Sequence, residues 1–324
     1  MDSYDYTLLS LFGLPVTIFA LFVVLGTMIG IVMAIYRTKK TRVSVDAVLW
    51  FAILGIPLGV TLARLVFCLY HFDELHYNGI GFLFHMEYGG FTVVGTFIGL
   101  ILSCIFTSAI TRENIFAIAD TVFPAILFVL SMERCGEEFT ENGMGLEVSI
   151  DALRFFPFAR PGVYDGMHTY AVNIFEGISA LFFSAYTQNM KKPVGRAVGT
   201  GVILTAAAQI AWESIRKDDR LMFDMASFLM IFCGIILLVT LIICLSQLNR
   251  GWKYNTAVLT GFSLLSVFIG LLQFFMEGKI IQTIPIWLCF ILTCLCASVI
   301  AFLCLHLLNA ATISDENNQV REAI

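Results

Sequence analysis

Apolar residues fill most of the chain in long runs, and short polar stretches separate these runs. A helix that crosses the hydrocarbon core of a bilayer needs about 20 mostly apolar residues. Nine runs come close to that length or exceed it, so the pattern predicts nine membrane-spanning helices, of which the sixth is the shortest. The predicted spans are 8–36, 47–70, 89–111, 115–132, 170–190, 197–212, 225–248, 257–276 and 284–308.

Composition supports this interpretation and excludes other classes of protein. Of the 324 residues, 59% are hydrophobic and 13% charged, and the mean hydropathy is +0.87. Soluble domains carry about 25% charged residues, so this chain has too few to cover a water-soluble surface. A net charge of −5 without a large basic patch excludes a nucleic-acid binder. The expected fold class is therefore all-α, a polytopic helical bundle in a membrane.

The cysteines indicate neither a disulfide framework nor a metal site. Eight of the nine lie inside apolar runs, where cysteine acts as a small hydrophobic residue. The chain contains no C-x-x-C pair, and Cys294-Leu-Cys296 has the wrong spacing for a helical metal site. We expect no metal and no cofactor.

Basic residues in the short loops predict the orientation. Ten of the nineteen lie in alternate loops, which we expect to be cytoplasmic: Arg37, Lys39, Lys40, Arg42, Arg112, Lys191, Lys192, Arg196, Arg250 and Lys253. The N-terminus is then outside and the C-terminus is cytoplasmic. The longest polar stretch, 133–168, falls on the outer face and is expected to fold into a cap. Residues from Ser314 onward are polar, and the pattern predicts that they are disordered.

Several ionisable residues lie within the predicted spans, where each costs at least about 2.5–3.5 kcal/mol at the bilayer centre. Arg64 and Glu176 are favoured as functional residues, although Arg64 could also extend to the interface. For Asp120, a functional role and a structural role are equally plausible. Glu213 and Arg216 are three residues apart, so they can pair on one helix face.

Glycines and a further arginine complete the candidate site. Gly89 and Gly90 precede the third span, where free backbone N–H groups could bind an anion. Arg134 and Gly136 follow the fourth span and begin the outer cap, at the depth where an arginine can hold a lipid phosphate. These residues together predict a site for an anionic lipid headgroup at the outer leaflet. Three G-x-x-x-G pairs, at Gly26, Gly55 and Gly95, are expected to pack helices closely.

The segment after the fourth span carries a family signature. In the prolipoprotein diacylglyceryl transferase family of bacterial plasma membranes, an Asp and a Pro four residues later precede G-R-x-G-N-F-x-N-G-E-x-x-G. Here Asp120 and Pro124 lead into ERCGEEFTENGMG, in which Arg134, Gly136 and Gly145 fall in register. The chain therefore resembles this family.

Four further segments resemble the family in the same order. They are the Ala63-Arg64 pair in the second span, the Gly89-Gly90 segment through Gly99, the segment ending in Glu176, and Gln209…Glu213…Arg216 in the sixth span. The likeness extends over residues 47–250. The chain departs from the pattern at the family's His, which falls on Val94, and at an Arg, which falls on Gln209. The two Asn of the signature fall on Glu137 and Thr140, and its Glu falls on Asn142.

The resemblance implies an organisation and a location for the chain. Residues 1–253 would form a seven-span transferase-like domain with the outer cap at 133–168, residues 254–309 two additional helices, and 310–324 a polar cytoplasmic tail. The protein would be a multi-pass protein of the bacterial plasma membrane.

The resemblance also implies an enzyme that moves a diacylglyceryl group from phosphatidylglycerol to the lipobox cysteine of prolipoproteins. Its partners would be phosphatidylglycerol, prolipoprotein signal peptides and membrane lipid, with no nucleic acid. Arg134 would clamp the phosphate, with Arg64 and Arg216 in support and Gly89, Gly90 and Gly136 near the headgroup. Glu176 or Glu213 would orient the arginines or accept the thiol proton.

Two alternatives remain open at this point. Because Val94 and Gln209 replace motif residues, the chain could be an inactive relative that binds anionic phospholipid or lipoprotein precursors. An unrelated small-molecule transporter is the second alternative.

Overall fold

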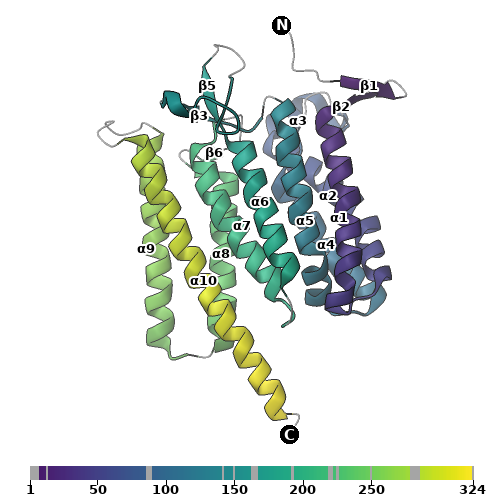
Figure 1. The fold of residues 1–324 in the computed structure, drawn as a ribbon, viewed down its shortest axis with the longest axis vertical. Helices are drawn as coiled ribbons and strands as arrows, with labels where there is room; N and C mark the ends of the chain where they lie inside the picture. Colours follow the sequence, from purple (N-terminus) through teal and green to yellow (C-terminus); the bar gives the residue numbers. More distant parts are fainter. Residues whose placement is uncertain are drawn as a thin grey trace. The chain divides into compact units, whose positions relative to one another are not determined.

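In the residues that it describes, the computed structural model contains ten α-helices, a few short 3-10 helices and several short strands (Figure 1). The structure describes residues 7–11, 14–84, 90–140, 142–148, 150–161, 167–190, 193–217, 222–223, 226–248, 250–277 and 285–322. Two compact units divide the chain. The smaller unit is Ile31–Val122, and the larger unit combines Met1–Gly30 with Phe123–Ile324. The unit boundaries pass through α1 and α5.

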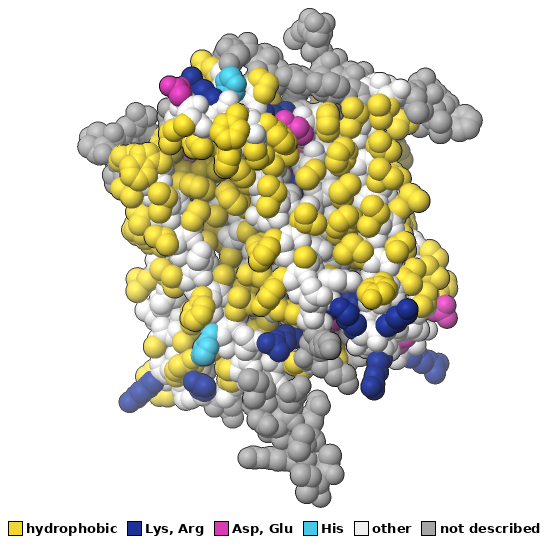
Figure 2. All heavy atoms as spheres, viewed as in Figure 1, with side chains coloured by type: hydrophobic (Ala, Val, Ile, Leu, Met, Phe, Trp, Pro, Cys, Tyr) yellow, Lys and Arg dark blue, Asp and Glu magenta, His cyan; other side chains and the backbone are white. Residues whose placement is uncertain are grey.

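A helix occupies each of the nine predicted spans. Eight helices in the described residues are long and apolar enough to cross a membrane, so the chain is an all-α, multi-pass membrane protein. They are α1 (Ile18–Thr41), α2 (Val45–Tyr70), α4 (Val93–Thr111), α5 (Ile115–Gly136), α7 (Arg196–Ile215), α8 (Phe228–Leu248), α9 (Trp252–Met276) and α10 (Ile286–Glu322). Figure 2 shows hydrophobic side chains along the helix flanks and Lys and Arg side chains near helix ends.

The ninth helix, α6 (Val172–Asn189), matches predicted span 170–190 but is not among these eight. Asn173 and Glu176 in its first turns lower its hydropathy, as do Gln188 and Asn189 at its end. Asn173 and Glu176 are buried, and α6 packs against α7. Neighbouring protein groups therefore surround Asn173 and Glu176.

Two expectations about the ends of the chain are wrong. The first span was expected to begin at residue 8, but Thr7–Leu11 (β1) and Leu14–Thr17 (β2) pair as an antiparallel hairpin before α1. Pro15 cannot occupy a helix interior, and the Thr17 hydroxyl caps α1 by accepting the Ala20 N–H at 3.2 Å. The tail expected to be disordered continues α10 to Glu322.

The smaller unit is held by close contact between α2 and α4. A Cβ atom added to Gly95 would lie 2.3 Å from the Leu62 carbonyl oxygen, and one added to Gly99 would lie 2.6 Å from that of Leu58. Only glycine fits at this separation, so the predicted packing role of this glycine pair is confirmed. The unit also contains α3 (Phe72–Asn78) and the short helix η1 (Gly79–Leu83).

In the larger unit, α7 packs against α6, α8 and α10, and α10 also packs against α8 and α9. Apolar side chains that are almost inaccessible fill the centre of this group: Ile203, Leu237, Leu241, Ile300, Cys304 and Leu307. One end of the unit carries a small sheet formed mainly by residues of the predicted cap segment. There β3 (Met144–Glu147), β4 (Ala159–Pro161) and β5 (His168–Ala171) form an antiparallel sheet in the order β3-β5-β4 (Figure 1). A hairpin of β6 (Met222–Phe223) and β7 (Ala226–Ser227) precedes α8.

Candidate functional site

Three helix ends of the larger unit bring together five charged side chains. We call Arg134, Glu137, Glu176, Glu213 and Arg216 the arginine–glutamate cluster. Arg134 lies in the last turn of α5, Glu176 near the start of α6, Glu213 in the last turn of α7, and Arg216 directly after it. All five residues are buried. Four of them are residues that the sequence analysis selected.

Two guanidinium groups share the carboxylates of the cluster. Arg134 Nη1 lies 2.5 Å from Glu137 Oε1, and Arg134 Nε lies 3.1 Å from Glu176 Oε2. Arg216 Nη1 lies 3.1 Å from Glu176 Oε2 and 3.9 Å from Glu213 Oε1. Arg216 Nη2 lies 3.5 Å from Glu137 Oε2. Glu137 and Glu176 therefore each bridge the two arginines.

Carboxyl groups outnumber guanidinium groups here, because three carboxylates of the cluster face two arginines and Glu133 of α5 also acts electrostatically on both arginines. Buried ion pairs recover their desolvation cost only when the geometry satisfies both partners. Removing one carboxylate reduces this excess, whereas removing one arginine enlarges a buried excess of negative charge.

Gln209, where the sequence departs from the family pattern, also reaches the cluster. Its Nε2 donates to Glu176 Oε1 at 2.8 Å and to Glu213 Oε1 at 3.4 Å. Gln209 and Glu213 are one helical turn apart on α7, and Glu176 accepts from donors on α5 and α7. A neutral amide therefore continues the hydrogen-bond network at this position.

The chain segment after α5 is fixed by an arginine that the sequence analysis did not select. Arg160, on β4, is buried, and its Nη2 donates to the Thr140 carbonyl at 2.6 Å and its Nη1 to the Asn142 carbonyl at 2.9 Å. This hydrogen bonding follows directly after the short helix η3 (Glu137–Phe139), which carries Glu137. Arg160 therefore holds the loop that places Glu137.

Two glycines allow the same loop to lie against α6 and Arg216. Gly143 has φ +80°, and a Cβ atom there would lie 2.5 Å from Asn173 Cβ. Gly145 forms a backbone bridge with Arg216. A Cβ atom on Gly145 would lie 2.7 Å from Val172 Cγ2, so side chains at these two positions would separate the loop from β5 and the start of α6.

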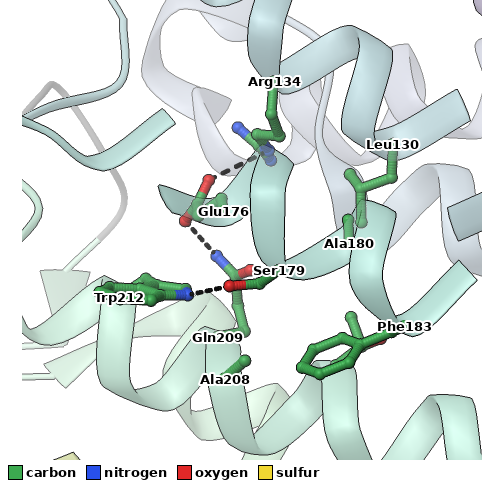
Figure 3. A pocket seen from close by; sticks show the side chains of 10 residues that line it. Leu130, Arg134, Glu176, Ser179, Ala180, Phe183, Ala208, Gln209 and Trp212 are labelled. Atoms are coloured by element: carbon green, nitrogen blue, oxygen red, sulfur yellow. Dashed lines mark hydrogen bonds and ion pairs between the residues drawn. The ribbon is translucent and has the colours of Figure 1, made fainter. Parts of the chain in front are cut away.

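A small pocket lies beside the cluster, between α5, α6 and α7 (Figure 3). Arg134, Glu176 and Gln209 form its polar end, and Trp212 Nε1 donates to Ser179 Oγ at 3.1 Å nearby. The Thr205 hydroxyl is buried in its wall and has no hydrogen-bond partner within the described part of the chain. Apolar side chains form the remaining wall: Leu130, Ala180, Phe183 and Ala208.

The remaining selected residues either pack helices, belong to the smaller unit or fall outside the described residues. Gly136 ends α5, and a Cβ atom there would lie 2.9 Å from Phe22 Cβ, so this glycine permits close packing on α1. Arg64 and Gly90 belong to the smaller unit, and Gly89 lies outside the described residues.

Within the smaller unit, Arg64 is buried and its guanidinium donates to backbone carbonyls. Nε reaches Leu83 at 3.2 Å, Nη1 reaches Gly90 at 3.1 Å and Nη2 reaches Phe82 at 2.8 Å. Arg64 also lies over the rings of Phe67 and Phe82. It therefore ties the segment before α4 to α2, and Gly90 contributes a carbonyl oxygen to this contact.

No three His, Cys, Asp or Glu side chains are placed to hold a metal ion among the residues that the structure describes. The chemical groups that the cluster offers are guanidinium donors, carboxylate acceptors and one amide. Such a set binds and orients an anion and can accept a proton.

Comparison with known proteins places these features in a family. The family model described as prolipoprotein diacylglyceryl transferase matches residues 6–246. A phosphatidylglycerol–prolipoprotein diacylglyceryl transferase of Clostridium novyi is 25% identical over 170 residues, which cover 52% of this chain and 66% of that protein. The transferase of Clostridioides difficile is 23% identical over 228 residues, 68% of this chain and 86% of that protein. One from Clostridium perfringens is 20% identical over 252 residues, 74% of this chain and 93% of that protein.

These matches cover both the arginine–glutamate cluster and the loop that carries Glu137. They give no support to the inactive-relative alternative or to the transporter alternative. The chain belongs to the prolipoprotein diacylglyceryl transferase family.

Proposed function

We propose that the protein transfers a diacylglyceryl group from phosphatidylglycerol to the lipobox cysteine of prolipoproteins in the bacterial plasma membrane. The observation that carries the proposal is the placement of two buried arginines, Arg134 and Arg216, around one carboxylate beside a pocket with an apolar wall. A phospholipid has the matching parts, an anionic phosphate joined to apolar chains.

Arg134 is the residue best placed to meet the phosphate. It lines the pocket, and its Nε and Nη1 bind carboxylates, whereas its Nη2 has no partner among the described residues. Charge-assisted hydrogen bonds from arginine to phosphate are about twice as strong as neutral ones. The unpaired Thr205 hydroxyl on the pocket wall can donate to an ester carbonyl of the same lipid.

The reaction requires a proton acceptor and stabilisation of the leaving group. The peptide thiol loses its proton, and the thiolate sulfur attacks the glycerol carbon that carries the phosphate. A C–S bond forms, the C–O bond to the phosphate breaks, and glycerol phosphate leaves with the bonding electrons. Arg134 and Arg216 stabilise the negative charge that develops on the phosphate. Glu176 orients both arginines and, because it lines the pocket, is the carboxylate available to accept the thiol proton.

The test is transfer by the purified full-length protein. Detergent-solubilised protein is incubated with phosphatidylglycerol and a fluorescent lipobox peptide, and the peptide mass is followed. The proposal expects a mass increase of one diacylglyceryl group, and none for a matched peptide with serine in place of the cysteine. Unmodified cysteine peptide after prolonged incubation, with lipid bound to the protein, would contradict the proposal.

Glu137→Gln is expected to lower the KM for phosphatidylglycerol about 3- to 10-fold, with little change in kcat. In the structure, the Glu137 carboxylate lies against both guanidinium groups that the phosphate must reach, and thus competes with it. Glutamine keeps a hydrogen-bond acceptor for Arg134 and removes the competing charge. The measurement is initial transfer rate against lipid concentration in mixed micelles.

Glu138→Gln is the matched control, since Glu138 lies on the same turn but contacts Arg160 and Asn173 instead of the two cluster arginines. Its KM is expected to match that of the wild type. A higher KM in Glu137→Gln would show that Glu137 assists lipid binding and does not compete with it.

We also propose that the cluster faces the outer leaflet. The end of α5, the start of α6 and the end of α7 meet there, while the basic residues Arg196, Arg250 and Lys253 lie at the opposite ends of α7, α8 and α9. Basic residues favour the cytoplasmic side. A green fluorescent protein fused to the C-terminus is expected to fluoresce, and alkaline phosphatase fused there to be inactive. Active phosphatase with a dark fluorescent fusion would reverse the orientation.

A further inference from the structure

Helices α9 and α10 lie beyond residues 6–246, which the family model matches. We propose that this helix pair positions Arg216, and that it does so through an ion pair between Glu277, at the end of α9, and Lys217. Lys217 and Glu277 are positioning residues that contact Arg216's neighbours and not the lipid. The proposal rests on the proposed function in one respect, which is that Arg216 takes part in diacylglyceryl transfer.

The ion pair joins α9 to the residue next to Arg216. Lys217 Nζ lies 3.1 Å from both carboxylate oxygens of Glu277. The Lys217 backbone N–H donates to the Met144 carbonyl at 2.8 Å, and Arg216 forms a backbone bridge with Gly145. Lys217 is thus held by its backbone to β3 and by its side chain to α9. Both contacts act on the chain immediately after Arg216.

A buried glutamine fixes the acidic partner of the pair. Gln273 is one turn before Glu277 on α9, is 1% exposed, and donates from Nε2 to Glu277 Oε1 at 3.4 Å. Burying an amide side chain in a membrane helix is costly unless it is hydrogen-bonded. Its contact with Glu277 therefore restricts the direction of the carboxylate that holds Lys217.

Apolar contacts of α9 and α10 reach α6 and α7, two of the three helices that supply the cluster. Leu272 and Met276 of α9 and Cys289 of α10 form one buried group with Ile215 of α7 and Val172 of α6. Ile215 precedes Arg216, and Val172 lies one turn before Glu176. The additional helix pair therefore packs against the backbone at the two points from which Arg216 and Glu176 extend.

A second set of contacts follows α7 along its length. The ring of Trp212 lies 6.1 Å from that of Phe290 on α10 and 5.4 Å from that of Phe175 on α6. Near the other end of α7, a Cβ atom on Gly199 would lie 3.0 Å from Leu308 Cδ2 of α10. Because α10 supports α7 at both ends, the Lys217–Glu277 pair acts on a helix whose axis is already fixed.

The pair is expected to affect geometry more than stability. The Lys217 side chain is 36% exposed, and ion pairs at that exposure contribute little to the free energy of unfolding. Small displacements of a catalytic arginine, in contrast, reduce rates strongly. Loss of the pair should therefore lower kcat while the thermal unfolding temperature stays close to that of the wild type.

The test compares wild type, Glu277→Gln, Lys217→Gln and the double charge swap Lys217→Glu/Glu277→Lys. We expect each single variant to lower kcat for transfer about 5- to 20-fold with KM within twofold, and the swap to restore at least half of the wild-type kcat. Asp151→Asn is the matched control. It removes an exposed ion pair, Arg154–Asp151, in the cap and is expected to leave kcat unchanged.

Hydrogen exchange of the backbone provides a readout that does not need activity. The Lys217 N–H is expected to exchange faster in both single variants and to regain protection in the swap, because its bond to Met144 depends on where Lys217 is held. Unchanged exchange in the single variants would overturn the positioning proposal. If the wild type shows no transfer but the exchange pattern is as expected, the proposed function fails and the positioning of the Arg216 segment stands.

Discussion

Arg134→Lys is expected to lower kcat/KM for transfer about 100- to 1,000-fold while the protein remains folded. Arg134 uses Nε for Glu176 and Nη1 for Glu137, which leaves Nη2 for the phosphate. The lysine ammonium is a single point charge, so it cannot reach two carboxylates and a phosphate in three fixed directions. Losing one donor to developing negative charge costs about 100- to 1,000-fold in rate.

Lysine is a sharper test than alanine at this position. Removing the charge would leave Glu137 and Glu176 buried with one arginine fewer, and breaking a buried ion pair costs about 3–5 kcal/mol of folding free energy. With lysine, the charge remains and the unfolding temperature reports whether the bundle is intact. Arg154→Lys, on an exposed ion pair in the cap, is the control and should retain full activity. Arg134→Lys with more than half of the wild-type kcat/KM would contradict the phosphate role.

Glu176→Gln is expected to lower kcat about 100-fold, with a smaller change in KM. Glu176 accepts from Arg134, Arg216 and Gln209, so its two oxygens hold three donors. Glutamine replaces one oxygen with an NH₂ group, which would face these donors and separate the two guanidinium groups. Folding should persist because Glu137 and Glu213 still balance the two arginines.

Glu213→Gln is the matched comparison for that variant. Its contacts with Gln209 and Arg216, at 3.4 Å and 3.9 Å, are longer than those that Glu176 makes with the same residues. Because hydrogen bonds and ion pairs weaken with distance, steady-state kinetics should show a loss of less than about tenfold. A larger loss of kcat in Glu213→Gln than in Glu176→Gln would contradict the central role assigned to Glu176.

The membrane helices could be predicted from the sequence because bilayer thickness imposes a minimum length of apolar residues. The ends of α7 and α8 lie close to the predicted limits. The start of α1 differs from its predicted limit, because residues 8–17 are as apolar as a membrane span and only Pro15 indicates that the helix begins later. The cap sheet was missed because its strands have three or four residues, which is too short for an alternating pattern to be recognised.

Local spacing predicted part of the candidate site. Glu213 and Arg216 were expected to pair at a separation of three residues, and they do. Arg134 and Glu137 have the same separation, so the same rule could have found Glu137. In contrast, the meeting of Glu176 with both arginines depends on how three helices pack, and no spacing along the chain encodes it. The role of Arg160 depends likewise on the pairing of β4 with β5.

Gln209 shows the limit of reasoning from a motif alone. The resemblance suggests that the change from arginine removes a phosphate ligand. The structure shows that the amide binds Glu176 at 2.8 Å, so the position still orients the central carboxylate. Within the arginine–glutamate cluster, Arg134 and Arg216 are then the two side chains that can bind a phosphate through a guanidinium group.

The most direct test of the account follows both products of one reaction. Purified protein receives phosphatidylglycerol labelled in the glycerol headgroup together with the lipobox peptide, and released glycerol phosphate and lipidated peptide are counted in the same sample. The account predicts equal amounts of the two products, no release without the peptide cysteine, and release at least about 100-fold slower with Arg134→Lys. Release of headgroup without lipidated peptide, or no release from lipid that is bound at the cluster, would contradict it.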